Sequence, residues 1–273
     1  MILDYKEYLH REGADGIENG NSKEKNIALF YSEKGVCPFC KVKVDNNIFC
    51  ESRNSYPEWL SGSFNEWETV NKCPICGWWE HIYRNSSDAI LDGIRLSEIK
   101  IHTSVLRKYE VSSSDIGVDV LSEYIKQNPD KIYKIHHKKM EELTQAILKE
   151  HYSCEVELVG KSHDGGKDLI LINNDQPTII QVKRRTRADK VEPVTTIREL
   201  LGTTILSEAK SCMFVTTADH YSSMAIKEAK KAVEIKAVEK FELIDYKRFI
   251  DMLNLNKVTD KEPWKRLVTL KQS

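Results

Sequence analysis

The chain has 273 residues, of which 40% are hydrophobic and 30% are charged, and its formal net charge is -1. This composition describes a soluble globular protein with one or two cores, and the length favours two. No uninterrupted apolar run approaches the length of a membrane span, which excludes a membrane-spanning chain. The first residues are charged, so no secretory signal is indicated and we expect a cytoplasmic protein.

The near-neutral total hides a difference between two parts of the chain. From Lys131 to the end there are 26 Lys and Arg against 21 Asp and Glu, whereas residues 1–130 carry 15 against 21. A positive excess of this size is modest evidence for a polyanionic ligand. If there is such a ligand, the second part of the chain is expected to bind it.

Two cysteine motifs of the same form stand in the first third of the chain. Cys37-Pro-Phe-Cys40 and Cys73-Pro-Ile-Cys76 can each present two thiolates to one ion, which predicts a tetrahedral Zn²⁺ site. Four sulfur ligands leave no open position for a substrate, so this zinc is expected to be structural. A redox role would need only one motif, and the odd count of seven cysteines argues against a disulfide framework. Cys50, between the motifs, could replace a ligand or pack nearby.

The first half of the chain divides into two predicted segments. Residues 1–85 are expected to form a small domain that resembles zinc-ribbon folds, with its many aromatic residues supplying core rather than stacking on bases. Residues 86–130 have helical spacing and predict a helical connector without chemistry. Within it, Asp88–Leu96 reads as helical, Ser112-Ser-Ser-Asp115 as a helix cap, and Val118–Gln127 as a helix that stops before Pro129.

The second half alternates predicted helices and strands and forms one predicted domain, residues 131–255, followed by a tail over 256–273. Helices are expected over 137–150, 194–207 and 222–233, strands over 154–159, 169–172, 178–183 and 211–216, and a final strand and helix over 241–253. Cys154 and Cys212 lie in the strand-like stretches and are expected to be buried. Interleaved strands and helices predict an α/β (α+β) fold with a mixed sheet flanked by helices on both faces.

A predicted hairpin carries polar groups at one end. Asp168 precedes the first strand, and the second strand ends in Gln181-Val182-Lys183, where alternation puts Gln181 and Lys183 on one face. If Asp168 lies at the same end, the three groups suit a Mg²⁺ ion with a bound phosphate. The alternative is a surface hairpin whose Gln and Lys face water. Arg184, Arg185 and Arg187 follow at once and predict nucleic-acid contacts, with a solvated loop as the alternative.

Four motifs of the second half occur together in one known family. They are Asp164-Gly-Gly-Lys-Asp168, Gln181-Val-Lys183, Ile197-Arg-Glu-Leu-Leu-Gly202 and Met213-Phe-Val-Thr-Thr217. In this order and rough spacing they resemble the Mrr-type restriction endonuclease catalytic domain of the PD-(D/E)xK nuclease superfamily, over residues 130 to 253. The resemblance implies a restriction-endonuclease-like sheet with an αβββαβ core.

The resemblance also implies roles for individual residues. Asp168, Glu141, the Gln181 amide oxygen and the Val182 carbonyl would hold Mg²⁺ or Mn²⁺, and Lys183 would orient the attacking water. Glu141 follows Met140 as the acidic member of a family pair, with Glu142 the less favoured choice. Gln181 stands where many superfamily members have Asp or Glu, which leaves the number of metal ions open.

The function implied by the resemblance is a Mg²⁺-dependent DNA endonuclease of restriction or anti-phage defence. Cleavage of both strands would favour a homodimer, and a subunit of a larger defence complex is equally compatible with it. Two alternatives stay open from the sequence: a non-cleaving nucleic-acid-binding sensor or assembly subunit, and an RNA-directed nuclease.

Overall fold

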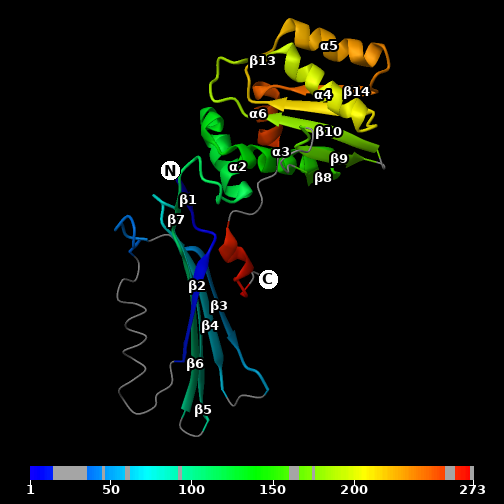
Figure 1. Ribbon diagram of the computed structural model, residues 1–273. Helices are drawn as coiled ribbons and strands as arrows, with labels where there is room; N and C mark the ends of the chain where they lie inside the picture. Colours follow the sequence, from blue (N-terminus) through cyan, green and yellow to red (C-terminus); the bar gives the residue numbers. More distant parts are fainter. Residues whose placement is uncertain are drawn as a thin grey trace. The chain divides into compact units, whose positions relative to one another are not determined.

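A computed structural model describes residues 1–14, 36–44, 47–58, 62–91, 94–159, 166–173, 176–255 and 262–270 of the chain (Figure 1). The chain forms two compact units. The α/β unit comprises Met1–Ile2 and Tyr109–Thr259, and the sheet unit comprises Leu3–Lys108 and Asp260–Ser273. The four-part division expected from the sequence stays a prediction. None of the helices in the described ranges is long and apolar enough to cross a membrane.

A five-stranded mixed sheet forms the centre of the α/β unit. Its order is β14-β12-β10-β9-β8, with β8 at Glu155–Leu158, β9 at Leu169–Asn173, β10 at Gln176–Lys183, β12 at Ser211–Thr216 and β14 at Lys240–Ile244. The pairs β8–β9 and β9–β10 are antiparallel, whereas β10–β12 and β12–β14 are parallel. The predicted hairpin is therefore present, and it leads into parallel strands that require helical crossovers.

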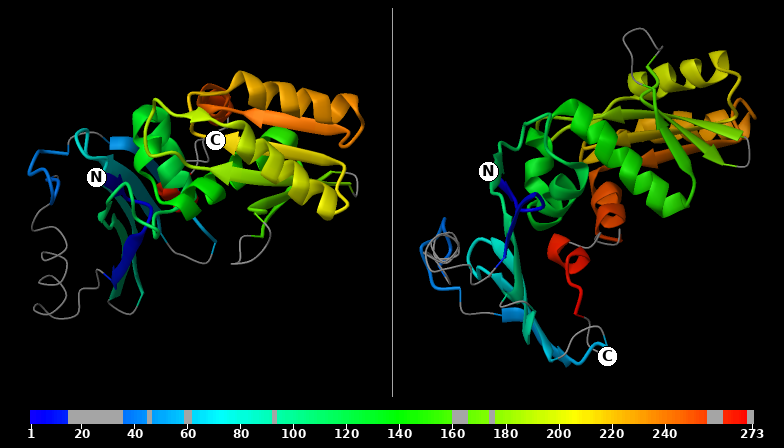
Figure 2. Two further views of the ribbon diagram at one scale, coloured as in Figure 1. Left: turned by 45° about the horizontal axis from the view of Figure 1, so that its top comes forward. Right: turned by 90° about the horizontal axis from the view of Figure 1, so that it is seen from below.

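Helices cover both faces of this sheet (Figure 2). The first face packs on α2 (Val118–Gln127), α3 (His137–Tyr152) and α6 (Tyr246–Leu255), and the second packs on α4 (Val194–Leu206) and α5 (Ser223–Glu234). Ile180 and Val182 belong to the first core and Ile179 to the second, as strand alternation predicts. The order α3-β8-β9-β10-α4-β12 confirms the αβββαβ core.

Short elements complete the α/β unit. The 3-10 helix η1 covers Pro129–Lys134, and β11 (Val191–Glu192) pairs in parallel with β13 (His220–Tyr221). The cap of α2 differs from the expectation: Gly117 stands at its N-cap, and Ser112–Asp115 lie upstream of the helix. Cys212 is buried as predicted, whereas Cys154 is half-buried against the first core.

The sheet unit is built on five antiparallel strands in the order β2-β6-β5-β4-β3. They are β2 (Tyr8–Ala14), β3 (Asn47–Ser55), β4 (Phe64–Lys72), β5 (Trp79–Leu91) and β6 (Ile94–Ser104), and a separate pair joins β1 (Ile2–Asp4) to β7 (Arg107–Tyr109). The helix expected over Asp88–Leu96 is wrong, because residues 88–91 continue β5 and residues 94–96 begin β6, while residues 92 and 93 lie outside the described ranges. Ile90 pairs with Arg95 and Leu91 with Ile94, so strand pairing has overridden the local helical spacing.

Aromatic residues of this unit divide between its core and its surface. Trp79 is buried with Val70 and Trp264, and Trp264 lies in the 3-10 helix η2 (Pro263–Arg266) near the C-terminus. Trp78 is buried beside the cysteine motifs, whereas Trp67 and Tyr56 are exposed. The expectation that the aromatics supply core therefore holds for only part of the set, and Trp59 lies outside the described residues.

A row of hydrogen-bonded titratable side chains crosses strands β2, β6, β5 and β4. His10 Nε2 lies 2.7 Å from Glu12 Oε1, His10 Nδ1 lies 2.8 Å from His102 Nε2, His102 Nδ1 lies 3.0 Å from His81 Nδ1, and His81 Nε2 lies 2.7 Å from Glu68 Oε1. The three imidazoles thus link the Glu12 and Glu68 carboxylates in one continuous row.

Candidate active site and cysteine cluster

Asp168 lies at the end of the hairpin, directly against the peptide that joins Gln181 to Val182. The regular pairing of β9 and β10 ends at Leu169 with Ile180, and the Asp168 amide then donates to the Ile180 carbonyl at 3.0 Å. Asp168 Oδ2 accepts the Val182 amide at 2.7 Å. The structure thus brings Asp168 to the end of β10 that the sequence predicted.

Gly166 and Gln181 approach each other beside this carboxylate. Gly166 has φ +83°, and a Cβ placed on it would lie 3.2 Å from Gln181 Nε2. Glycine is therefore favoured there by its backbone conformation, and a Cβ would displace the Gln181 amide by a few tenths of an ångström. Gln181 is 8% exposed, and its Oε1 has no hydrogen-bond partner among the described residues. A buried amide oxygen of this kind can accept a hydrogen bond from a bound group or coordinate a cation. Asp164 and Gly165, expected in the same turn, lie outside the described residues.

Lys183 ends β10, two residues after Gln181 and on the same face of the strand by alternation. Its side chain is half-buried, and its carbonyl accepts the Thr217 amide at 3.1 Å. The carbonyl is thereby anchored to the end of the neighbouring strand β12. Val182 is buried on the opposite face, and the role of its carbonyl as a metal ligand stays a prediction.

Glu141 comes from a different element, the helix α3. Its neighbour Met140 packs in the first core together with Ile180, so α3 covers the face opposite to the one that Gln181 occupies. Glu142 forms an ion pair with Lys139. The structure thus brings Asp168 and Gln181 together, whereas the participation of Glu141 stays a prediction.

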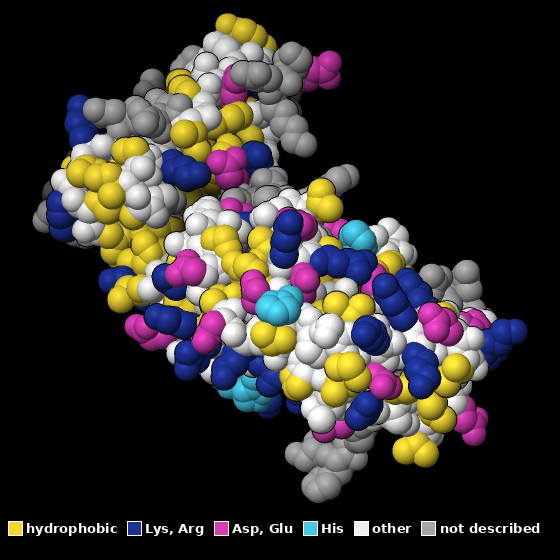
Figure 3. Space-filling model, turned by 90° about the horizontal axis from the view of Figure 1, so that it is seen from above, with side chains coloured by type: hydrophobic (Ala, Val, Ile, Leu, Met, Phe, Trp, Pro, Cys, Tyr) yellow, Lys and Arg dark blue, Asp and Glu magenta, His cyan; other side chains and the backbone are white. Residues whose placement is uncertain are grey.

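The three arginines after Lys183 have protein partners. Arg184 Nη1 donates to the Tyr133 carbonyl at 2.7 Å, and Arg185 is paired with Glu192, a fully buried carboxylate. Arg187 is exposed and pairs with Asp189, which is also exposed. On the face drawn in Figure 3, Lys and Arg side chains are interspersed with Asp and Glu rather than gathered in one patch.

Sequence reasoning missed Glu192 and the hydroxyl of Thr216. Thr216 Oγ1 donates to Glu192 Oε2 at 2.9 Å, and both side chains are fully buried. One signal was present in the sequence, because Glu192 interrupts an otherwise apolar stretch, Val191 to Val194, shortly after three arginines. A lone acid in such a stretch needs a cationic partner once it is buried.

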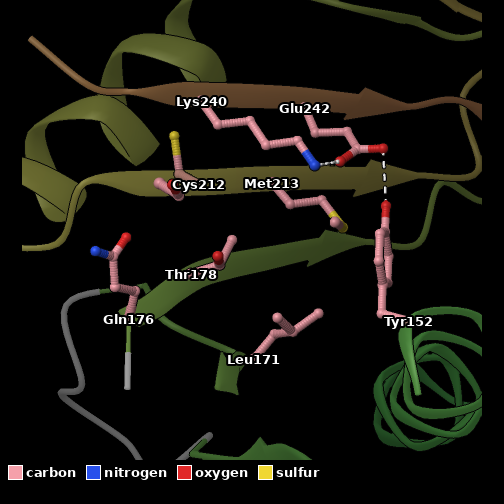
Figure 4. Close-up of a pocket in the computed structure, with 9 residues that line it drawn as sticks. Tyr152, Leu171, Gln176, Thr178, Cys212, Met213, Lys240 and Glu242 are labelled. Atoms are coloured by element: carbon pink, nitrogen blue, oxygen red, sulfur yellow. Dashed lines mark hydrogen bonds and ion pairs between the residues drawn. The ribbon is translucent and has the colours of Figure 1, made fainter. Parts of the chain in front are cut away.

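A pocket lies at the other end of the parallel strands, where β10, β12 and β14 begin. It is lined by Tyr152, Leu171, Gln176, Thr178, Ser211, Cys212, Met213, Lys240 and Glu242. Tyr152 donates to Glu242 Oε1 at 2.9 Å, and Lys240 Nζ lies 2.8 Å from Glu242 Oε2 (Figure 4). Its charged groups neutralise one another, and none of the predicted site residues lines it. Ligands of α/β sheets bind at the carboxyl ends of parallel strands, which is the end that carries Lys183.

The two cysteine motifs fold into matching turns in the sheet unit. In the first, the Lys41 amide donates to the Cys37 carbonyl at 2.9 Å; in the second, the Gly77 amide donates to the Cys73 carbonyl at 3.0 Å. Lys41 and Gly77 both have positive φ, 57° and 81°. The repeated sequence pattern thus produces a repeated backbone turn.

These turns bring four thiols together, as the sequence predicted. The sulfur atoms of Cys37, Cys40, Cys73 and Cys76 all lie within 4.8 Å of one another, and Cys37 Sγ lies 3.6 Å from Cys76 Sγ. Tetrahedral Zn²⁺ with bonds of about 2.3 Å needs sulfur atoms on the order of 3.8 Å apart, so the thiols fit zinc. Cys50 is exposed on β3 and is not one of the four.

The thiols differ in acidity. Burial opposes ionisation of Cys73, but amide hydrogen bonds from Cys76 and Ile75 outweigh it and lower the pKa of Cys73 to about 7. A hydrogen bond to Cys76 raises the pKa of Cys40 to about 12. A cation bound among them would displace the remaining protons, which couples metal binding to pH.

Comparison with protein-family models assigns the α/β unit. Residues 132–253 match the model described as "Restriction endonuclease", of the Mrr catalytic type. A comparison with curated proteins found no match.

Proposed function

Because residues 132–253 form a restriction endonuclease domain of the Mrr type, we propose that the protein is a divalent-metal-dependent endonuclease that hydrolyses phosphodiester bonds in DNA. The observation that carries the proposal is the buried Gln181 Oε1, which lacks a partner among the described residues at the point where Asp168 meets β10. An amide oxygen and a carboxylate oxygen on adjacent strands are the hard ligands that Mg²⁺ prefers.

The residues proposed to hold Mg²⁺ or Mn²⁺ are Asp168, the Gln181 amide oxygen, the Val182 carbonyl and Glu141. An ion bound there would supply Lewis-acid chemistry, since it offsets phosphate charge and makes water more acidic. Asp168 is oriented for this role by the Val182 amide, which donates to one of its carboxylate oxygens. Gln181 contributes no charge, so most of the attraction comes from the carboxylates.

Lys183 is proposed to act on the water and the phosphate. From the end of β10 its ammonium can orient the attacking water and offset negative charge as it builds on the phosphate oxygens. The anchored Lys183 carbonyl fixes where the side chain starts, so the ammonium samples a restricted volume. In-line attack would leave a 3′-hydroxyl and a 5′-phosphate.

The biological setting proposed is restriction or anti-phage defence in the cytoplasm. The four cysteines would hold a structural Zn²⁺, and the sheet unit would serve as a target-recognition or partner-binding module. Each active site cuts one strand, so cleavage of a duplex favours a homodimer, or a subunit within a defence complex.

Plasmid cleavage in Mg²⁺ tests the proposal. Asp168→Ala and Lys183→Ala should lower the cleavage rate at least about a hundredfold, while Lys210→Ala, an exposed lysine paired with Glu239, should cut like the wild type. A chelator should abolish cutting by every variant. Equal cutting by Asp168→Ala, Lys183→Ala and the wild type would remove this site from the mechanism.

One observation favours a second candidate, a nucleic-acid-binding sensor without cleavage. Gln181 replaces a carboxylate that many superfamily members use, which weakens the hold on a cation. DNA binding that is independent of Mg²⁺, with no nicking in Mg²⁺ or Mn²⁺, would support the sensor. Offering DNA and RNA together in the same assay separates a DNA nuclease from an RNA-directed one.

A further inference from the structure

We infer that Arg185 and Glu192 act as a positioning pair, which fixes the end of β10 and thereby the direction of Lys183. The inference rests on the proposed function, because it assigns these residues to the same site. It also changes the role expected for Arg185, from a contact with the nucleic acid to a support within the protein.

The pair is bidentate and its carboxylate is inaccessible to solvent. Arg185 Nε donates to Glu192 Oε2 at 3.0 Å, and Arg185 Nη2 donates to Glu192 Oε1. The Glu192 side chain is 0% exposed and that of Arg185 is 30% exposed. Two parallel bonds to a carboxylate hold a guanidinium plane in one orientation. A phosphate could take Arg185 only by leaving Glu192 charged and buried, which is strongly unfavourable.

Hydroxyl groups at the end of β12 connect this pair to Lys183. Thr216 Oγ1 donates to Glu192 Oε2 at 2.9 Å and lies 3.2 Å from the Lys183 carbonyl. The Thr217 amide donates to the same carbonyl at 3.1 Å, and Thr217 Oγ1 accepts the Arg185 amide at 2.7 Å. Both threonines are fully buried. The backbone on either side of residue 184 is therefore tied to one rigid group of side chains.

Of the other two arginines, Arg184 supports the fold and Arg187 faces solvent. Arg184 is half-buried and donates to the Tyr133 carbonyl of η1, so it fastens the same strand end on another side. Arg187 is 67% exposed, and its partner Asp189 is 63% exposed. An exposed pair of this kind exchanges readily with other ions, so the charge of Arg187 is available to a phosphate.

The consequence for catalysis follows from geometry. A long side chain such as Lys183 starts from its own Cα, so a shift of the strand end moves the ammonium by at least as much. A displacement of about 1 Å at a reacting group can lower turnover about a hundredfold. Loss of the pair should therefore reduce the rate of the chemical step and leave binding of DNA unchanged.

The experiment compares Glu192→Gln, Arg185→Lys and the double variant with the wild type in multiple-turnover cleavage. Glu192→Gln keeps the shape and an oxygen for Thr216 but removes the charge. We expect kcat to fall between about tenfold and a hundredfold with KM unchanged, and the double variant to lose no more than the worse single variant. The matched control is Arg198→Ala, which removes an exposed arginine paired with Glu228 and should leave kcat unchanged.

DNA binding as a function of salt separates the two roles of arginine. Loss of one phosphate contact lowers the salt slope by about 0.9, which is expected for Arg187→Ala and not for Arg185→Gln or Glu192→Gln. If Arg185→Gln lowers the slope while Glu192→Gln keeps the wild-type kcat, Arg185 contacts the nucleic acid and the inference is overturned.

Amide hydrogen exchange tests the positioning pair without relying on nuclease activity. Glu192→Gln should speed exchange of the Thr217 and Arg185 amides. The first donates to the Lys183 carbonyl and the second to Thr217 Oγ1. A wild type that cuts no nucleic acid would refute the proposed function alone, and the exchange rates would still decide on the pair. Unchanged exchange at both amides would overturn it.

Discussion

Replacing His81 by alanine is expected to destabilise the sheet unit more than any change at the exposed end of the same row of side chains. His81 is 2% exposed and Glu68 is 0% exposed, and they lie 2.7 Å apart. Burial alone would raise the pKa of Glu68, but hydrogen bonds from His81 and from the Leu270 and Thr269 amides lower it. The carboxylate is therefore charged at neutral pH and depends on these donors.

The magnitude follows from what His81→Ala leaves behind. Removing one partner of a buried pair costs about 3–5 kcal/mol, because the other charge stays buried. Glu68 keeps the Thr269 amide at 2.9 Å and the Leu270 amide at 2.6 Å, so the loss should lie near the lower limit. We expect the free energy of unfolding of the sheet unit to fall by about 3 kcal/mol.

Urea unfolding at pH 7, followed by tryptophan fluorescence, measures this loss, since Trp78, Trp79 and Trp264 are buried in the same unit. His10→Ala is the matched control: it removes the imidazole at the other end of the row, where His10 is 42% exposed and Glu12 is 57% exposed. An exposed pair contributes about 0–1 kcal/mol. Equal losses in the two variants would refute the reasoning, because burial would then make no difference.

Three further predictions concern single features of the structure. Gly166→Ala should lower stability by about 1–2 kcal/mol through its positive φ and slow cleavage by pushing on Gln181, whereas Gly202→Ala, with no atom within 4 Å of the added Cβ, should be tolerated; equal melting temperatures and rates would contradict this. Purified protein should contain one zinc per chain by metal analysis, lost in Cys73→Ser and kept in Cys50→Ser; zinc retained by Cys73→Ser would argue against the four-thiol site. Burial and the neighbouring His81 and His10 lower the pKa of His102 to about 4, from about 6.5 when unfolded. Between these values the unfolded chain binds a proton that the folded chain does not, so stability should fall as pH falls from 6.5 to 4, by at most about 1.4 kcal/mol per pH unit. Urea titrations of the wild type and His102→Gln test this, and identical slopes in that window would contradict it.

Local sequence patterns correctly predicted the features that depend on residues close together in the chain. The two Cys-Pro-x-Cys turns close through hydrogen bonds within six residues, so the sequence contains the whole turn, and the four thiols meet as expected. The hairpin from Asp168 to Lys183 was equally predictable, because two short apolar runs flank a turn. The helix α3 followed from the spacing of Met140, Leu143 and Ile147.

Prediction failed where distant partners decided the outcome. Residues 88–91 and 94–96 have helical spacing, yet they extend β5 and β6, whose mutual pairing continues as far as Glu80 with Thr103. Arg185 follows the strand that ends in Gln181-Val182-Lys183 and looks like a phosphate contact, but its guanidinium donates two hydrogen bonds to Glu192. A charged residue reads the same in sequence whether its partner is a ligand or the protein itself.

By itself, the sequence determined the kind of domain, the order of strands and helices in the α/β unit, and the four cysteines able to hold a metal ion, since each depends on short-range spacing or on motifs. Only the tertiary structure decided that Gln181 presents a buried oxygen beside Asp168 with no partner among the described residues, and that two of three arginines are held within the protein. The reason is physical: burial and hydrogen-bond partners are properties of the packed chain, and they fix which polar groups remain free to act.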